Sequence, residues 1–230
     1  MKTGVLLSGG LDSVVLLADE ASRGAVQPMY VSVGLSWEPA ERAMVERCLA
    51  SGPFVGTVGP LVSLTIDMRD IYASTHWAVR GQPPAYHTPD EDVYLPGRNI
   101  VLLGKAGVYC AAAGLDRLVL GTLSGNPFPD ATAEFRGVME RTLTLGLGHA
   151  LRVEAPYATL TKTDVIRRGA ALGVPFELTL SCMNPQTGAA GFLKHCGACS
   201  KCRERHDAFV EARIQDPTEY ADTTYIIRHT

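Results

Sequence analysis

The sequence of 230 residues lacks several features that would assign a chain to a broad class at once. It has no apolar run of the length that a membrane span requires, so we expect no membrane partner. Its formal net charge is only −3, so it lacks the basic surplus typical of proteins that bind nucleic acid. Its first residues predict a strand rather than a signal peptide. We therefore expect a cytoplasmic protein with neither nucleic acid nor a membrane as a partner.

The chain also lacks internal repeats and low-complexity linkers. Its apolar content of 46% and charged content of 20% are those of a globular protein. A chain of this length can bury one sizeable core and carry a small appendage.

Apolar, strand-like runs alternate with segments of helical periodicity. We expect strands at 4–8, 28–33, 61–66, 117–121 and 151–155, and helices after Val14 and at 38–50, 98–113, 133–146 and 161–173. The last of these helices begins with a possible capping box. Such alternation predicts an α/β fold with a doubly wound parallel sheet, whose ligands bind at the carboxyl ends of the strands. Residues 80–96 are expected to form a long surface loop, either a lid or a mobile segment.

The most informative segment follows the first predicted strand. Ser8-Gly9-Gly10 interrupts the apolar pattern, and a helix is expected to begin immediately after it. Glycines let the backbone approach an anion, and the free N–H groups of a helix start point at that anion. Asp12 cannot bind a phosphate directly, so it would hold the phosphate through a bridging Mg²⁺ or cap the helix. The hydroxyls of Ser8 and Ser13 add hydrogen-bond donors for the phosphate. The Gly-Lys-Ser/Thr of a Walker loop is absent.

Residues 8–13 resemble the SGGxDS pyrophosphate loop of the ATP pyrophosphatases. The alternative is an ordinary strand, turn and helix built with small residues. The resemblance implies that ATP binds to Leu7, Ser8, Gly9, Gly10, Leu11, Asp12 and Ser13, and to Gly121, which follows another predicted strand.

Four of the six cysteines lie close together near the C-terminus. They are Cys182, Cys196, Cys199 and Cys202. Two successive CxxC steps suit one structural zinc ion with four cysteine ligands, and an iron–sulfur cluster is the alternative. His195 adjoins this cluster and is expected to be a bystander. Cys48 and Cys110 fall within apolar helical patterns and are expected in the core.

With the loop and the cysteines in place, nearly the whole chain resembles the QueC/ExsB family, the 7-cyano-7-deazaguanine synthases. The shared motifs are Tyr94-Leu95-Pro96-Gly97-Arg98-Asn99, Gly121 with Pro129-Asp130 and Phe135, Lys162 at a helix start, and Ser181-Cys182 with the cysteine tail through Arg205 and Phe209. The resemblance implies a Rossmann-like pyrophosphatase domain of the adenine nucleotide alpha hydrolase type at 1–175. A zinc-binding helical segment would follow at 176–230.

The matched positions also have physical interpretations of their own. Arg98 could grip a phosphate or carboxylate with two hydrogen bonds, and Lys162 could meet the charge of a transferring phosphate. Asp130 could accept hydrogen bonds from the N–H groups of a guanine-like base. Phe135 could stack on that base or belong to the core. The resemblance implies substrate binding by Arg98, Asn99, Asp130 and Phe135, and roles in catalysis for Ser8, Asp12, Ser13, Arg98 and Lys162.

The resemblance implies an ATP-dependent ligase that acts on 7-carboxy-7-deazaguanine. ATP with Mg²⁺ would adenylate the carboxylate, and ammonia would displace AMP to give an amide. A second adenylation would convert that amide to the nitrile, in queuosine biosynthesis. Family members are often homodimers, so a homodimer is an expectation here as well.

Two segments depart from the family pattern, and one of them is Thr179-Leu180-Ser181-Cys182-Met183, where family members have Thr-Trp-Ser-Cys-Tyr. Family members usually have Tyr-Pro-Asp-Cys in the substrate loop, where this chain has Phe128-Pro129-Asp130-Ala131. This change keeps open a related ligase that passes the acyl adenylate to another amine. Two further alternatives are a tRNA-thiolating enzyme built on the same loop and a nucleotide-binding module without activity.

Overall fold

A computed structural model describes residues 2–188 and 191–226 of the chain. Its centre is a sheet in which five strands run parallel, in the order β3-β2-β1-β4-β5. The strands are β1 (Thr3–Leu6), β2 (Val26–Ser32), β3 (Val62–Thr65), β4 (Arg117–Val119) and β5 (Arg152–Glu154). The chain order reverses between β1 and β4, so the carboxyl edge near these two strands is where a ligand is expected.

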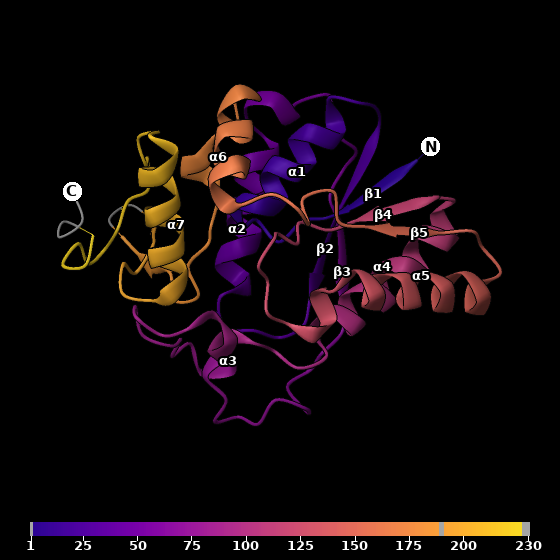
Figure 1. Ribbon diagram of the computed structural model, residues 1–230, viewed down its shortest axis with the longest axis horizontal. Coiled ribbons are helices and arrows are strands. Elements are labelled where there is room, and N and C mark those ends of the chain that lie inside the picture. Colours follow the sequence, from indigo (N-terminus) through magenta and orange to yellow (C-terminus); the bar gives the residue numbers. More distant parts are fainter. Residues whose placement is uncertain (1, 189–190, 227–230) are drawn as a thin grey trace.

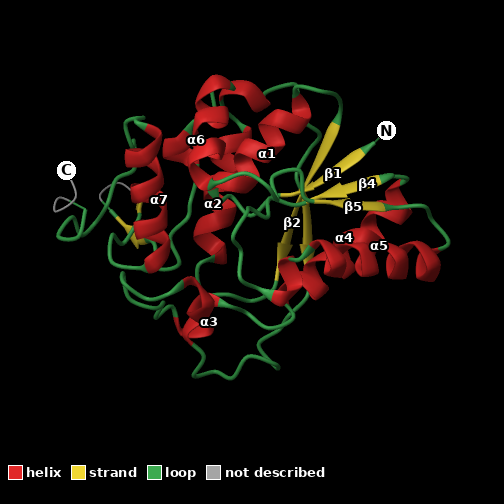
Figure 2. Cartoon of the chain, in the orientation of Figure 1, coloured by secondary structure: helices red, strands yellow, loops and turns green. Residues whose placement is uncertain are grey.

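Helices cover both faces of this sheet (Figures 1 and 2). One group contains α1 (Leu11–Ala21) and α6 (Lys162–Ala171), with α2 (Glu38–Leu49) beside them; the other contains α4 (Arg98–Ala113) and α5 (Ala133–Leu147). The strands explain the two layers, since neighbouring residues alternate between the two hydrophobic cores. Tyr30 belongs to the core on the α1 side, whereas Met29 and Val31 belong to the core on the α4 side.

The remaining elements are short or lie at the C-terminal end. They are the helix α3 (Trp77–Arg80), the 3-10 turns Gly52–Phe54, Asp90–Val93, Pro129–Ala131 and Phe176–Leu178, the hairpin of β6 (Gln186–Thr187) and β7 (Leu193–Lys194), and the helix α7 (Ser200–Ala212). Helix α7 lies beside α6 (Figure 1) and joins the core on the α1 side through Phe209, which contacts Phe176 edge to face at 5.2 Å. The division of the chain near residue 175 stays a prediction.

The expected doubly wound parallel sheet is confirmed, and each expected strand and helix has a counterpart. The capping box is present as well: the Thr161 hydroxyl accepts from the Asp164 backbone N–H, and the Asp164 carboxylate accepts from that of Thr161. Residues 80–96 differ from a simple surface loop, because Tyr86, Val93 and Leu95 are buried there. Within the described residues, no helix combines the length and the apolar character needed to cross a membrane.

Candidate active site

The segment after β1 forms a closely bonded loop that leads into α1. The Ser13 hydroxyl donates to the Gly10 carbonyl oxygen at 2.9 Å and accepts from the Ser8 backbone N–H at 3.2 Å. The Ser8 hydroxyl lies 3.2 Å from that of Ser13 and accepts from the Gly10 N–H at 3.3 Å. The two hydroxyls therefore hold the loop in one shape. Since α1 begins at Leu11, its free N–H groups lie beside this loop.

Two glycines are required by this geometry. Gly9 has φ +78°, and a Cβ there would lie 2.9 Å from Val45 Cγ2 and 3.2 Å from the Glu41 carbonyl oxygen. Gly121, after β4, approaches the start of α1, where an added Cβ would lie 3.3 Å from the Ser13 nitrogen. Leu7 and Leu11 are buried in the core, so only their backbones can contribute to nucleotide binding.

Asp12 and Lys162 meet beside the loop, as the first turns of α1 and α6 bring them together. Lys162 Nζ lies 3.1 Å from Asp12 Oδ2 and 2.7 Å from Oε1 of Glu204, which comes from α7. Burial by itself would lower the pKa of Lys162, but the two carboxylates outweigh it and raise that pKa. The Asp12 side chain caps no helix, and its Oδ1 is buried without a hydrogen-bond partner in the described part of the chain.

The charged groups continue away from the loop through α7. Glu204 Oε2 accepts from Lys201 Nζ at 2.7 Å, and that ammonium lies 3.6 Å from Asp90 Oδ1. Burial would raise the pKa of Glu204, but Lys162 and Lys201 lower it to about 2. Glu204 is therefore an anion between two cations at the mouth of the site.

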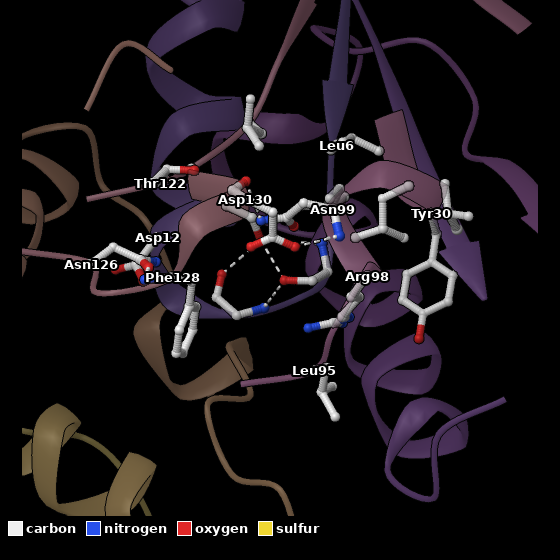
Figure 3. A pocket seen from close by; sticks show the side chains of 18 of the residues that line it. Leu6, Asp12, Tyr30, Leu95, Arg98, Asn99, Thr122, Asn126, Phe128 and Asp130 are labelled. Atoms are coloured by element: carbon white, nitrogen blue, oxygen red, sulfur yellow. Dashed lines mark hydrogen bonds between the residues drawn. The ribbon is translucent and has the colours of Figure 1, made fainter. Parts of the chain in front are cut away.

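A cavity of about 270 Å³ opens between the loop and the start of α4 (Figure 3). Arg98, Asn99 and Asp130 line it together with Ser8, Gly10 and Asp12. Three of the predicted substrate residues, Arg98, Asn99 and Asp130, thus lie with the predicted loop at the carboxyl edge between β1 and β4. A second cavity, of about 440 Å³, shares the loop and Arg98 and reaches Lys162.

Asn99 and Asp130 are bonded to each other. The Asn99 backbone N–H donates to Asp130 Oδ2 at 3.2 Å, and the Asn99 side-chain amide donates to the Asp130 carbonyl oxygen at 3.0 Å. Burial raises the pKa of Asp130, while the bonds from Asn99 oppose that rise. Asp130 Oδ2 is therefore occupied by the Asn99 N–H at the start of α4. The other oxygen, Oδ1, buried and without a partner among the described residues, is the one left for a ligand.

The aromatic residues of the cavity differ from the expected one. Phe135 lies on the first turn of α5, lines neither cavity and packs against the core. Phe128 lines both cavities, and its ring stacks on Tyr94 with centroids 5.1 Å apart. Helical spacing explains this position, because it turns Phe135 toward α4 and the sheet.

The four tail cysteines converge on one point. Their Sγ atoms all lie within 4.8 Å of one another, and all four side chains are buried. Backbone N–H groups of Asn184 and Cys196 donate to Cys182 Sγ at 3.3 and 3.2 Å. Four buried thiols with such donors fit a tetrahedral metal ion. All six cysteines are free, and Cys48 and Cys110 are buried in the core as expected.

Two buried side chains, those of His195 and Arg205, hold the cysteine segment in place through hydrogen bonds. His195, expected to be a bystander, accepts the Ser181 backbone N–H on Nε2 at 3.1 Å and so orders the residue before Cys182. Arg205 is completely buried and donates to the Thr179 hydroxyl at 2.7 Å and to the Phe176 carbonyl oxygen at 2.8 Å. These bonds join α7 to the segment that follows α6.

Sequence reasoning missed four residues of the site. They are Tyr30, Glu41, Lys201 and Glu204. Glu41 is buried at the wall of both cavities, where burial raises its pKa to about 7. No motif marks these positions. Glu41 sits within an ordinary amphipathic helix, and Glu204 resembles any charged residue of a surface helix.

The chain is similar to proteins of one family along almost its entire length. The profile of the family described as "Queuosine biosynthesis protein QueC" matches residues 2–213. A 7-cyano-7-deazaguanine synthase of Methanopyrus kandleri is 36% identical, over 96% of this chain and 99% of that protein. One of Caldicellulosiruptor bescii is 33% identical, over 96% of this chain and 97% of that protein.

A solved structure of a 4-thiouridine synthetase with RNA and bound ATP has a TM-score of 0.48 and 16% identity to this chain, covering 92% of it and 51% of the synthetase. The expectation that nucleic acid is not a partner stays a prediction. The match over residues 2–213, together with relatives above 30% identity at nearly full coverage, shows that this chain belongs to the QueC family.

Proposed function

We propose that this protein is an ATP-dependent ligase that makes 7-cyano-7-deazaguanine from 7-carboxy-7-deazaguanine and ammonia. The observation that carries the proposal is the shared cavity: the Ser8–Ser13 loop forms one wall, and Arg98 with Asp130 forms another. A phosphate site and a site for a planar polar base would then lie in the same cavity. The names of the relatives agree with this assignment.

At the phosphate wall, the loop would receive the pyrophosphate end of ATP. The substrate carboxylate attacks the α-phosphorus, a P–O bond forms, and the bond to pyrophosphate breaks. The free N–H groups at the start of α1 and the Lys162 ammonium then stabilise charge on the departing pyrophosphate. The nucleophile is already an anion and needs no base. The protein's main contribution to this step is therefore to position the two substrates and to stabilise the developing charge electrostatically.

Two metals belong to the proposal, and they have different roles. Asp12 would hold Mg²⁺ through its unpartnered Oδ1, and the ion would supply charge neutralisation at the phosphates. Zinc would be held by the four tail cysteines, one ion per chain, with no coordination position left for chemistry. A zinc ion there would fix the N-terminal end of α7, and with it Glu204.

At the other wall, Asp130 and Arg98 would recognise the deazapurine. Asp130 Oδ1 can accept N–H groups from a guanine-like edge, and the Arg98 guanidinium can bind a carboxylate or phosphate oxygen. In the view of Figure 3 the Arg98 side chain is drawn between those of Phe128 and Tyr30, and Arg98 lines both cavities. The Phe128 and Tyr94 rings supply an aromatic wall for the base.

Ammonia then attacks the carbonyl carbon of the acyl adenylate, so that a C–N bond forms and the C–O bond breaks. AMP leaves with one oxygen of the original carboxylate. The amide oxygen attacks a second ATP, and AMP leaves again as the nitrile forms. Each cycle consumes two ATP and releases two AMP and two pyrophosphate. We include in the proposal ammonia as the amine donor, a homodimer and a cytoplasmic location.

The direct test is mass spectrometry of the products made by purified protein from 7-carboxy-7-deazaguanine, ATP, Mg²⁺ and ammonium. We expect the nitrile, with two AMP for each product, and none without ATP. A reaction that ends at the amide, or that attaches the acyl group to a protein amine, would contradict the nitrile assignment and leave the adenylation intact. Absence of AMP with this substrate would overturn the proposal.

A further inference from the structure

Glu41 is a carboxylate that lies beside the phosphate loop. It lies on the first turns of α2, is 7% exposed, and lines both cavities together with Ser8, Gly10 and Arg98. Its Oε2 accepts the Tyr30 hydroxyl, from β2, at 2.9 Å. Its backbone passes close to Gly9, since a Cβ added at Gly9 would lie 3.2 Å from the Glu41 carbonyl oxygen.

Three carboxylates line the cavity of about 270 Å³, and they have different partners. Asp12 forms an ion pair with Lys162, and Asp130 accepts a backbone N–H from Asn99. Glu41 has the neutral phenol of Tyr30, and no ion pair to Glu41 occurs within residues 2–188 and 191–226. Neither Asp130 nor Glu41 forms an ion pair among these residues, but Asp130 is bonded to Asn99 at the start of α4, so Glu41 is the carboxylate that we consider for proton exchange with a ligand.

Burial and the charged groups around Glu41 together place the pKa of its carboxyl close to neutral pH. Burial raises its pKa to about 7, and Glu38 on its own helix adds to that rise. Arg98 from α4 and the hydroxyl of Tyr30 from β2 oppose it. Glu38 itself accepts the backbone N–H groups of Val33 and Gly34, so it is occupied by the turn before α2. A base with such a pKa can accept a proton near neutral pH and release it to water.

The proposed reaction needs such a base after the first adenylation and not before it. The substrate carboxylate carries no proton when it attacks ATP. When ammonia attacks the acyl adenylate, a C–N bond forms, the C–O bond to AMP breaks, and one N–H proton must leave. When the amide oxygen then attacks a second ATP, one of the two remaining N–H protons leaves with formation of the adenylated intermediate, and the last leaves as the C–O bond to AMP breaks and the nitrile forms.

We propose that Glu41 is the proton acceptor for the nitrogen-centred steps, and that Tyr30 is a positioning residue that holds its carboxylate toward the cavity. The inference rests on the proposed function. In the amide-forming step the Glu41 carboxylate takes the proton from the attacking nitrogen while AMP leaves as an anion. The proton passes to water before the next step.

The test compares two half-reactions in Glu41→Gln, which keeps the side-chain shape and an oxygen for the Tyr30 hydroxyl. We expect ATP–pyrophosphate exchange with 7-carboxy-7-deazaguanine to stay within about threefold of wild type. Amide formation in a single turnover should fall about 100-fold. At constant free ammonia, the wild-type rate should rise with pH around a midpoint near 7, and the variant should lose that rise. Glu46→Gln, on the exposed side of α2, is the control and should match wild type.

Tyr30→Phe adds a readout that a structural role would not change. The hydroxyl favours the ionised form of Glu41 and holds its carboxylate, so its loss should move the midpoint to higher pH and lower the rate at high pH by less than Glu41→Gln does. If exchange falls as much as amide formation in Glu41→Gln, Glu41 serves substrate binding and the inference is wrong. It is also wrong if amide formation is unaffected. A wild-type protein without exchange would instead overturn the proposed function, and this inference with it.

Discussion

The Lys162 ammonium lies 2.7 Å from the Glu204 carboxylate and so ties the start of α6 to the helix that carries Cys202. Lys162 also contacts Asp12, at the start of α1, so the three helices meet at one cation. A change in the cysteine segment can therefore reach the phosphate loop through Glu204 without any direct contact. This connection makes the tail part of the site as well as of the fold.

The first prediction concerns this connection. Glu204→Gln keeps the side-chain shape but removes the charge that holds Lys162 against α7. We expect ATP–pyrophosphate exchange at saturating ATP to fall about tenfold, since Lys162 then keeps only Asp12 as its anionic partner. The thermal midpoint should fall as well, because a partly buried cation loses one of two counter-charges.

Glu219→Gln is the matched control for Glu204→Gln. Glu219 is largely exposed and pairs with Lys194 on the surface, where an ion pair contributes little to stability. We expect no change in exchange for this variant. Normal exchange in Glu204→Gln, with the same thermal midpoint as wild type, would show that Glu204 does not position Lys162.

The second prediction tests the phosphate loop. Ser13→Ala removes the hydroxyl that bonds both the Gly10 carbonyl and the Ser8 N–H. We expect exchange to fall by about 100-fold, because a loop without these bonds would misplace its N–H donors toward a developing anion. Circular dichroism should be unchanged.

Ser13→Ala is a better variant here than a substitution at Gly9, where positive φ and contact with Val45 would strain the fold. Ser22→Ala, at the other end of α1, is the control and should retain exchange. Equal rates for the two variants would exclude the loop as the pyrophosphate site.

The third prediction concerns the metal. We expect one zinc ion per chain by elemental analysis, and we expect Cys199→Ser to lower both the zinc content and the thermal midpoint. Zinc binding contributes directly to folding at such sites, so the loss of stability should exceed any loss of exchange in the fraction that stays folded. Iron in place of zinc, or a metal-free wild type with full stability, would contradict this assignment. Cys48→Ala, in the hydrophobic core and outside the four-cysteine cluster, should keep the zinc.

The motifs of the sequence predicted most of what lies along one strand or one turn. The loop at Ser8, the capping box at Thr161 and the cysteine cluster all depend on local spacing, and local spacing is visible in one sequence. Glu41 and Glu204 could not be found in this way. Each joins the site through tertiary packing, from α2 or α7, and its own segment gives no sign of the partner.

The aromatic residues show the same limit. Phe128 and Phe135 lie within eight positions of each other, and both follow the strand β4. Their roles depend on the 3-10 turn at Pro129–Ala131, which leaves Phe128 on the cavity and starts α5 before Phe135. The sequence marks a turn at Pro129 but does not fix which aromatic ring faces the site.

The last prediction concerns recognition of the base by Asp130. Asp130→Asn removes the charge but leaves an oxygen that can still accept the Asn99 N–H, so the start of α4 should stay intact. The substrate's N–H donors would lose a charged acceptor, an effect of about 1.5–3 kcal/mol. We therefore expect the KM for 7-carboxy-7-deazaguanine to rise at least tenfold, with the KM for ATP within about twofold.

Steady-state kinetics with each substrate varied in turn checks this expectation. Asp116→Asn is the control, because Asp116 lies at the start of β4, at the opposite edge of the sheet, and is exposed. If only the KM for ATP changes in Asp130→Asn, Asp130 binds the nucleotide or its metal ion instead of the base. The unpartnered Oδ1 of Asp130 favours the base, because the proposed function assigns Mg²⁺ to Asp12.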